Sequence, residues 1–119
     1  MIDLITVLGH TAGGKTAFAA QLAFRLDGEI ISADSRQVYR GMDIGTAKPD
    51  PAEQAAVTHH LVDIVDPDTP FDAQKYAVEA FQIVLELTAR TVLPFVVGGT
   101  GLYIKALTFG LFDAEPTDS

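Results

Sequence analysis

The sequence contains no cysteine and no tryptophan. Without cysteine, neither a disulfide framework nor a thiolate metal site can hold the fold or perform chemistry. No apolar run approaches the roughly 20 residues that a membrane-spanning helix needs. The first four residues, Met-Ile-Asp-Leu, carry no basic leader of the secretory type. We therefore expect a cytoplasmic protein without a membrane segment.

Basic residues are also scarce, with eight Lys and Arg against sixteen Asp and Glu, for a net charge of −8. A nucleic-acid-binding domain normally carries a basic surface. Any contact with nucleic acid must therefore depend on a local patch or on protein outside these residues. Arg36, Arg40 and Lys48 form the one basic concentration in the sequence. A contact to a nucleic-acid backbone and ordinary solvated charges both fit them.

Hydrophobic residues are plentiful, at 48% of a 119-residue chain, which suits one packed domain over residues 1–119. The last residues, 113–119, read as a polar tail. Four short apolar runs predict strands, because each is bounded by glycine, proline or aspartate. These runs are Ile2 to Leu8, Glu29 to Ala33, His60 to Val65 and Pro94 to Val97.

Helical patterns separate these runs. One helix is expected up to Leu26 with a stop at Asp27-Gly28, one starts after Asp50, one runs from Asp72 to about Arg90, and one follows Gly101. In the third, Asp72 is the expected N-cap, and Glu86 pairs with Arg90 on the outer face. Its expected core stripe is Ala73, Ala77, Ala80, Phe81, Val84, Leu87 and Thr88. Alternating strands and helices predict an α/β fold, with a parallel sheet covered on both faces.

Residues 9–16 fit the pattern G-x-x-x-x-G-K-[ST] at every fixed position. The glycines let the backbone curl so that successive amides point at phosphate oxygens, at the positive end of the helix that follows. Lys15 adds a positive charge, and the hydroxyl of Thr16 is placed to ligate Mg²⁺. Because the pattern lies between a predicted strand and a predicted helix, it favours phosphate binding over a chance match. The predicted phosphate-binding residues are Gly9, His10, Thr11, Ala12, Gly13, Gly14, Lys15 and Thr16.

Asp34 follows directly after the second predicted strand. Ligands of open parallel sheets bind outside the carboxyl ends of the strands, so Asp34 is expected in one cleft with Lys15 and Thr16. A carboxylate there can accept a proton from a nucleophile that attacks beside the bound phosphate. Two other roles stay open: an N-cap for the turn at Ser35-Arg36, and a water-mediated ligand of Mg²⁺.

Four further blocks occur in order after the phosphate loop. They are Asp-Ser-Arg-Gln-Val-Tyr (34–39), Gly-Met-Asp-Ile-Gly-Thr-Ala-Lys-Pro (41–49), His-His-Leu (59–61) and Gly-Gly-Thr-Gly-Leu-Tyr (98–103). Together with residues 9–16 they resemble the tRNA dimethylallyltransferases, also called isopentenyltransferases. The resemblance runs from Ile2 to about Leu111, nearly the whole chain.

The family transfers a dimethylallyl group from dimethylallyl diphosphate to the exocyclic N6 amine of the adenosine next to the anticodon of tRNA. The resemblance implies that residues 9–16 hold the diphosphate of this donor rather than ATP. It implies that Thr11 contacts the diphosphate near the breaking bond, as a catalytic residue. It also implies that Asp34 is the general base that takes the proton of the amine, with Mg²⁺ as the cofactor.

The resemblance implies a contact with tRNA through four consecutive residues, Asp34, Ser35, Arg36 and Gln37. Thr100 matches a threonine that contacts the flipped-out adenosine. An enzyme that acts on a base must extract it from its stack, so a narrow channel between the two substrates makes physical sense.

The chain departs from the family at two points. His10 stands where family members usually carry proline or alanine, and we interpret it as tolerated because it falls on a variable position of the loop. Family members are also substantially longer, and the region beyond Ser119 would supply an arginine at the diphosphate, a helical insertion and much of the tRNA-binding surface. The resemblance therefore implies the N-terminal portion of a P-loop NTPase-like fold, truncated and expected as a monomer.

His59 and His60 precede an apolar strand, and no third histidine lies at metal-ligand spacing, so a structural or hydrogen-bonding role is favoured over a metal site. Tyr39, Tyr76 and Tyr103 are interpreted as core or boundary residues rather than as base-stacking platforms.

Three alternatives stay open. A small-molecule kinase shares the phosphate loop, although only Arg90 and Lys105 in the C-terminal part could serve its lid. A catalytically inert fragment that binds only diphosphate is the second, because four strands leave the sheet one short of the usual core. The third is a prenyltransferase that acts on free adenine nucleotides.

Overall fold

A computed structural model describes residues 4–8, 13–34, 37–41, 49, 51–98 and 105–107, with the backbone alone at 7–8 and 13–17. In this part of the chain, four parallel strands form one sheet in the order β1-β4-β2-β3. The strands are β1 (Ile5–Leu8), β2 (Glu29–Ser32), β3 (His59–His60) and β4 (Pro94–Gly98). The helices are α1 (Gly13–Arg25), α2 (Pro51–Ala56) and α3 (Ala73–Ala89). The predicted α/β class with a parallel sheet is confirmed.

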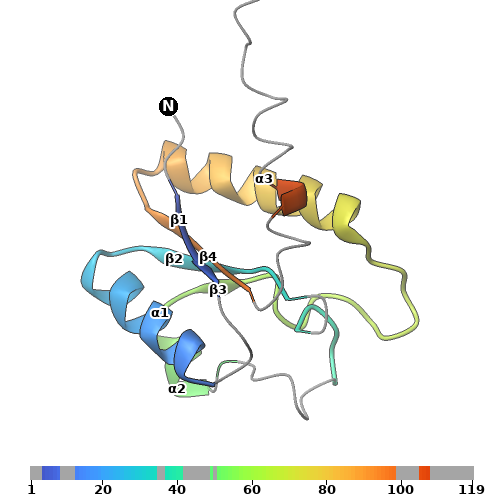
Figure 1. The fold of residues 1–119 in the computed structure, drawn as a ribbon, viewed down its shortest axis with the longest axis horizontal. Coiled ribbons are helices and arrows are strands. Elements are labelled where there is room, and N and C mark those ends of the chain that lie inside the picture. The colour runs from blue at the N-terminus through green and yellow to red at the C-terminus, as the bar shows by residue number, and fades with distance from the viewer. Residues whose placement is uncertain are drawn as a thin grey trace, which may run out of the picture.

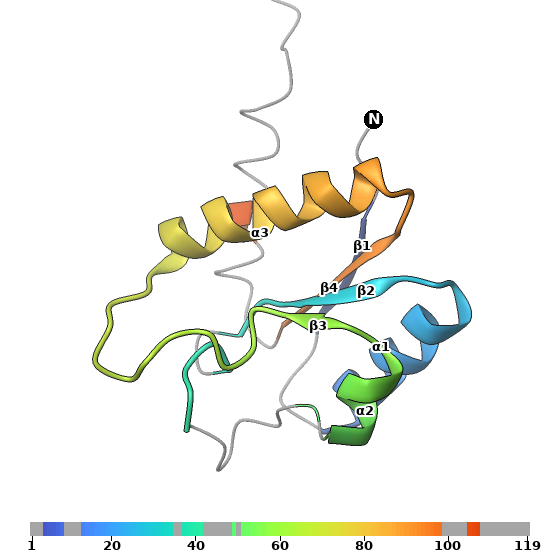
Figure 2. The same ribbon diagram turned by 180° about the vertical axis from the view of Figure 1, so that it is seen from behind.

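The helices cover both faces of this sheet, with α3 on one side and α1 and α2 on the other (Figures 1 and 2). Side chains alternate along the strands, so neighbours in sequence enter different clusters. Ile31 and Val96 pack toward α3, whereas Ile30 and Phe95 pack toward α1. Because both faces are buried, the strands read as continuous apolar runs rather than as an alternating pattern.

The N-cap of α3 and the ion pair near its C-terminal end are those that the sequence predicts. The side chain of Asp72 accepts a hydrogen bond from the backbone N–H of Lys75 at 2.9 Å, which satisfies one of the unpaired amides of the first turn. Near the other end, Arg90 Nη1 lies 3.4 Å from Glu86 Oε1. The capping residue and the outer ion pair are both confirmed.

The core stripe of α3 differs from the prediction by one large side chain. The fully buried residues are Tyr76, Ala80, Val84 and Leu87. Tyr76 was missing from the predicted stripe but is buried completely, which agrees with its interpretation as a core residue. The remaining predicted members are half-buried; they are Ala73, Ala77, Phe81 and Thr88.

The predicted third strand, His60 to Val65, is wrong in its extent. β3 covers only His59–His60, because Leu61 and Asp63 take positive φ values of 66° and 56°. A left-handed residue turns the chain out of the extended conformation, so the ladder with β2 cannot continue. Further on, Val65 forms an isolated parallel bridge with the half-buried Tyr39.

The stop predicted at Asp27-Gly28 is confirmed. Asp27 has a φ of 54°, and the N–H of Gly28 closes the helix end by donating to the carbonyl of Ala23 at 2.7 Å. A Cβ on Gly28 would lie 2.6 Å from the carbonyl oxygen of Leu93 and from the ring of Phe95. The glycine therefore lets the chain pass from α1 into β2 directly over β4.

Residues 105–107 are helical, in agreement with the helix predicted after Gly101, and Leu107 is buried against the α3 side of the sheet. Tyr103, Asp50 and the tail 113–119 lie outside the described residues. In the described part of the chain, no helix has the length and apolar character needed to span a membrane.

Candidate functional site

Three parallel strands end at one edge of the sheet. Leu8 of β1 is in register with Gly98 of β4, and Val97 of β4 is in register with Ser32 of β2. The chain therefore leaves the sheet at this edge before each of the three predicted site segments, residues 9–16, 34–37 and 99–100. Neighbouring strands lie about 4.8 Å apart, so β1 and β2 are roughly 10 Å apart across β4.

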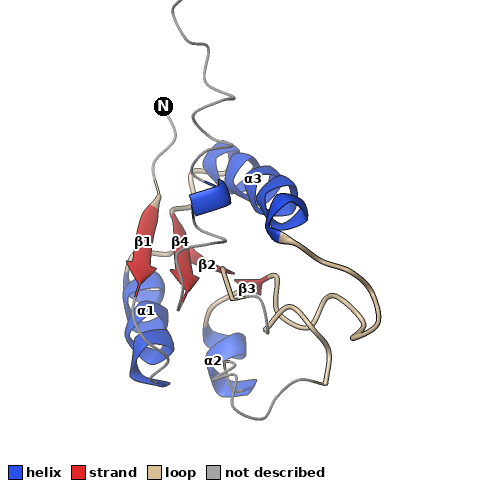
Figure 3. Ribbon diagram, turned by 45° about the vertical axis from the view of Figure 1, so that its right-hand side comes forward, coloured by secondary structure: helices blue, strands red, loops and turns tan. Residues whose placement is uncertain are grey.

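The predicted phosphate loop comes between β1 and α1 in the sequence. Gly9, His10, Thr11 and Ala12 lie outside the described residues, whereas Gly13, Gly14, Lys15 and Thr16 form the first turn of α1. The first turn of a helix has amides without helical partners and carries the positive end of the helix dipole. Figure 3 shows α1 beside β1, and phosphate binding at the start of this helix stays a prediction.

Asp34 lies at the same edge and on the face that α1 covers. Because side chains alternate, Ile30, Ser32 and Asp34 point to one side, and Ile30 belongs to the cluster packed against α1. The half-buried Asp34 accepts a hydrogen bond from the backbone N–H of Gln37 at 3.3 Å. The carboxyl group therefore lies on the sheet face that α1 covers, and a cleft shared with Lys15 and Thr16 stays a prediction.

Gln37 is held inside the protein rather than projecting from it. The residue is 8% exposed, and its Oε1 accepts a hydrogen bond of 2.9 Å from the hydroxyl of the buried Ser32. Together with the bond to Asp34, this contact ties Gln37 to the last residue of β2 and to the carboxylate that follows that strand. The other residues predicted to touch tRNA, Ser35, Arg36 and Thr100, lie outside the described residues.

A small hollow of about 20 Å³ opens beside Asp34. Its lining is Ile30, Ser32, Asp34, Gln37, Pro49, His59, Val97 and Gly98. His59 is the member that sequence reasoning did not connect with Asp34. The two residues lie 25 positions apart, and only the register of Ile30 with His59 brings them together.

The two neighbouring histidines make different contacts. His60 Nε2 lies 2.7 Å from Glu29 Oε1, whereas His59 Nδ1 lies 2.8 Å from the carbonyl oxygen of Val57. Burial lowers the pKa of His59, against the opposing effects of the Val57 carbonyl and the Glu53 carboxylate. The predicted hydrogen-bonding role of the pair is confirmed. No group of three or more His, Asp or Glu residues able to hold a metal ion exists among the described residues.

Of the predicted basic concentration, only Arg40 is described. Its guanidinium lies 2.8 Å from the carboxylate of Asp66, and both side chains are more than half exposed. The pair places a negative charge next to this arginine. Arg36 and Lys48 lie outside the described residues.

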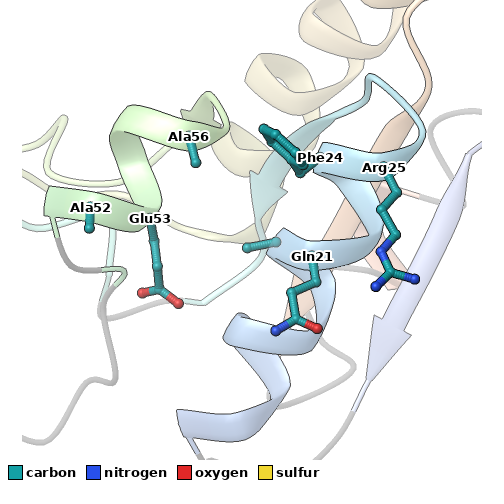
Figure 4. A pocket seen from close by; sticks show the side chains of 7 residues that line it. Gln21, Phe24, Arg25, Ala52, Glu53 and Ala56 are labelled. Atoms are coloured by element: carbon teal, nitrogen blue, oxygen red, sulfur yellow. The ribbon is translucent and has the colours of Figure 1, made fainter.

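A larger groove of about 410 Å³ lies between α1 and α2 (Figure 4). Its lining is Ala20, Gln21, Phe24, Arg25, Ala52, Glu53 and Ala56. These α1 residues lie on the second half of the helix, roughly 10 to 18 Å along its axis from the first residue, Gly13, at 1.5 Å per residue. Size alone does not make this groove the functional site, because it lies away from the edge where the strands end.

The predicted Mg²⁺ ligand, Thr16, has its backbone in the first turn of α1. An ion held there by one hydroxyl, phosphate oxygens and waters needs no cage of carboxylates. The position of Thr16, one residue after Lys15 at the start of the helix, fits such an ion.

Residues 37–119 match the IPP transferase family. A tRNA dimethylallyltransferase from Syntrophobacter fumaroxidans is 55% identical over 117 residues, which cover 98% of this chain and 34% of that protein. A second, from Roseiflexus sp., is 58% identical over 110 residues, which cover 92% of this chain and 36% of the relative. The chain thus spans about a third of the length of these relatives.

Solved structures give the same result. The full-length tRNA isopentenylpyrophosphate transferase from Bacillus halodurans matches with a TM-score of 0.86 and 46% identity, covering 99% of this chain and 38% of that structure. A tRNA isopentenylpyrophosphate transferase from Staphylococcus epidermidis matches with a TM-score of 0.83 and 45% identity, covering 87% of this chain and 34% of that structure.

Proposed function

Because this chain belongs to the IPP transferase family, we propose that it carries the donor-binding and base-bearing part of a tRNA dimethylallyltransferase. The proposed reaction moves a dimethylallyl group from dimethylallyl diphosphate to the N6 amine of the adenosine adjacent to the anticodon. One observation carries the proposal. The strand ends that lead to the phosphate loop and to Asp34 meet at one edge, with Asp34 on the face covered by α1.

In the proposed reaction, residues 9–16 hold the diphosphate of the donor. The amides of the loop and the Lys15 ammonium stabilise the charge that the diphosphate gains as the allylic C–O bond breaks. Thr11 is assigned to the oxygen at the breaking bond. Mg²⁺ bound through Thr16 would supply further positive charge at the phosphate oxygens.

Asp34 is the proposed general base. The N6 amine forms the new C–N bond to the allyl carbon, the C–O electron pair leaves with diphosphate, and the amine proton passes to the Asp34 carboxylate. The N–H of Gln37 donates to this carboxylate, and the hydroxyl of Ser32 in turn donates to the Gln37 side chain. A fixed carboxylate needs no reorganisation at the moment of proton transfer, which favours catalysis.

The tRNA contacts are assigned to Asp34, Ser35, Arg36, Gln37 and Thr100, with the protein acting as a monomer in the cytoplasm. An acidic chain of −8 needs added basic surface to hold a phosphate backbone. The chain spans about a third of its relatives, so we assign most of the tRNA surface to the remaining two thirds.

The proposal is tested by incubating the chain with labelled dimethylallyl diphosphate, Mg²⁺ and either unmodified tRNA or AMP. Label on tRNA alone supports it, and label on AMP identifies a free-nucleotide prenyltransferase instead. Asp34→Asn keeps the shape of the side chain and removes the base, so we expect a loss of transfer on the order of a hundredfold or more. Asp72→Asn, at the exposed cap of α3, is the matched control.

Donor binding is measured separately by thermal melting. Dimethylallyl diphosphate with Mg²⁺ should raise the melting temperature of both the wild-type chain and Asp34→Asn, but not of Lys15→Ala. A larger shift with ATP would indicate a kinase. If neither compound raises the melting temperature, the chain folds but does not bind a donor. If Asp34→Asn transfers the prenyl group at the wild-type rate, Asp34 is not the general base.

A further inference from the structure

Ser32 and Gln37 are buried polar residues that are bonded to each other. Ser32 is 3% exposed and Gln37 is 8% exposed. The hydroxyl of Ser32 donates a hydrogen bond of 2.9 Å to Gln37 Oε1. Burying polar groups costs free energy that their mutual bond only offsets, and two apolar residues of similar shape can occupy such positions at little loss. Stability alone therefore does not account for this pair.

The pair lies beside the Asp34 carboxylate. Ser32 is the last residue of β2, Asp34 follows two positions later, and both line the hollow of about 20 Å³ together with Gln37. The backbone N–H of Gln37 donates to Asp34 Oδ1 at 3.3 Å. Gln37 therefore connects two residues at the end of one strand, Ser32 through its side chain and Asp34 through its backbone.

A second segment binds the backbone of Gln37. Its carbonyl oxygen accepts a hydrogen bond of 2.9 Å from the backbone N–H of Asp63. The side chain, the carbonyl and the N–H of one residue are thus bonded to three different residues, Ser32, Asp63 and Asp34. With the first two bonds in place, Gln37 has little freedom to rotate, and its N–H stays directed at the carboxylate. Bonds in a buried position are also stronger than the same bonds in water, because the local dielectric is lower.

We propose that Ser32 is a positioning residue for Asp34 and that it acts through Gln37. The Ser32 hydroxyl keeps Gln37 against the end of β2, so that the Gln37 N–H fixes one oxygen of the carboxylate before a substrate arrives. A carboxylate with a fixed orientation needs less reorganisation when it accepts a proton. The inference rests on the proposed function in one respect, that Asp34 accepts the amine proton. Ser32 itself touches neither substrate.

Two variants separate positioning from stability. Ser32→Ala removes the hydroxyl and with it the bond to Gln37. Ile31→Val, at the neighbouring position of β2, is the matched control. Ile31 is fully buried in the cluster on the α3 side of the sheet, so this change weakens the core without removing a contact of Gln37. Deleting one buried methylene and deleting one hydrogen bond cost similar amounts of stability, so a purely structural role of Ser32 predicts equal effects of the two variants.

A third variant, Gln37→Leu, tests the same bond from its other end. Leucine keeps the backbone N–H but offers no acceptor to the Ser32 hydroxyl. It should therefore act in the same direction as Ser32→Ala in both readouts. This variant decides the question if Ser32→Ala does not fold.

The first readout needs no activity. Amide hydrogen exchange, followed by NMR, measures how often the Gln37 N–H leaves its acceptor. In Ser32→Ala this amide should exchange about tenfold faster than in the wild type, which corresponds to the loss of one hydrogen bond. The Ala33 N–H, which donates to the Val97 carbonyl at 2.7 Å, should keep its rate. An unchanged rate at Gln37, or an equal rise at Ala33 and Gln37, would overturn the proposal.

The second readout is the transfer reaction. Ser32→Ala should lower kcat by about tenfold with unchanged KM for the donor and for tRNA, whereas Ile31→Val should keep the wild-type kcat. A rise in KM for tRNA alone would assign the pair to substrate binding, and equal losses of kcat in the two variants would assign Ser32 to the fold. Either result rejects the positioning role. If no protein transfers, the wild type included, the proposed function fails, while the exchange rates still decide whether Ser32 directs the Gln37 N–H.

Discussion

The carboxylate of Glu29 lies 2.7 Å from His60 Nε2, across the β2–β3 pair. Its second oxygen lies 3.0 Å from Arg90 at the end of α3. The Glu29 side chain is 15% exposed, which distinguishes it from surface ion pairs such as Arg40 with Asp66. One carboxylate thus ties two strands to the helix that covers them.

The first prediction concerns acid stability. Burial alone would raise the pKa of Glu29, but the hydrogen bonds and positive charges of His60 and Arg90 outweigh burial, so the pKa lies below its ordinary 4.5. The stabilisation is therefore complete above about pH 4.5 and is lost as the pH falls through the lower folded value. Glu29→Gln should cost about 1 kcal/mol at pH 7 and flatten the decline in acid. Glu86→Gln, which touches Arg90 from an exposed position, should cost about 0.3 kcal/mol in the same urea titration.

The second prediction concerns His59 and a higher pH range. Because burial lowers its pKa, the unfolded chain binds the proton more tightly than the folded chain does. The resulting stability is present above about pH 6.5 and declines as the pH falls below that value. Urea midpoints measured at pH 7.5 and 5.5 should differ less in His59→Gln than in the wild type. An identical difference in both proteins would show that His59 does not titrate in folding.

The third prediction compares two leucines of α3. Leu87 is fully buried in the cluster between α3 and the sheet, whereas Leu85, two residues earlier, is 44% exposed. Leu87→Ala should cost about 3 kcal/mol, because it removes buried apolar atoms and leaves a cavity. Leu85→Ala should change the free energy of unfolding by less than about 1 kcal/mol. Similar losses at both sites would place the buried face of α3 elsewhere.

The fourth prediction compares two glycines at which a side chain is unfavourable for different reasons, a steric clash at Gly28 and a positive φ at Gly41. At Gly28 a Cβ meets the Leu93 carbonyl and the Phe95 ring at 2.6 Å, so Gly28→Ala should cost about 2 kcal/mol or more. At Gly41 the space is open but φ is 80°, so Gly41→Ala should cost only about 1 kcal/mol of backbone strain. Denaturant midpoints of the two variants measure both effects, and the reverse order would refute the steric account of Gly28.

Several features follow from the sequence because their causes are local. The Asp72 cap, the stop at Asp27-Gly28 and the Glu86–Arg90 pair each join residues within one helical turn or its end. The family resemblance and the α/β class rest on motifs and on the order of elements along the chain, and the comparisons confirm them. The third strand was predicted too long, since positive φ values at Leu61 and Asp63 carry no strong signal in an apolar run.

Other features depend on contacts between residues far apart in the chain, and only the tertiary structure decided them. The strand order β1-β4-β2-β3 determines which strand ends are neighbours. It places the carboxyl end of β1, which precedes residues 9–16, two strand spacings from the carboxyl end of β2, which precedes Asp34. The register of Ile30 with His59 lets His59 and Asp34 line one hollow, although no local pattern connects the two residues. Sequence motifs predict the chemistry of a site because backbone conformation and helix capping depend on residues that are close together in the sequence. Strand pairing brings the segments of the site together. It joins segments that are far apart in the sequence, and their separation in the sequence does not predict their distance in space.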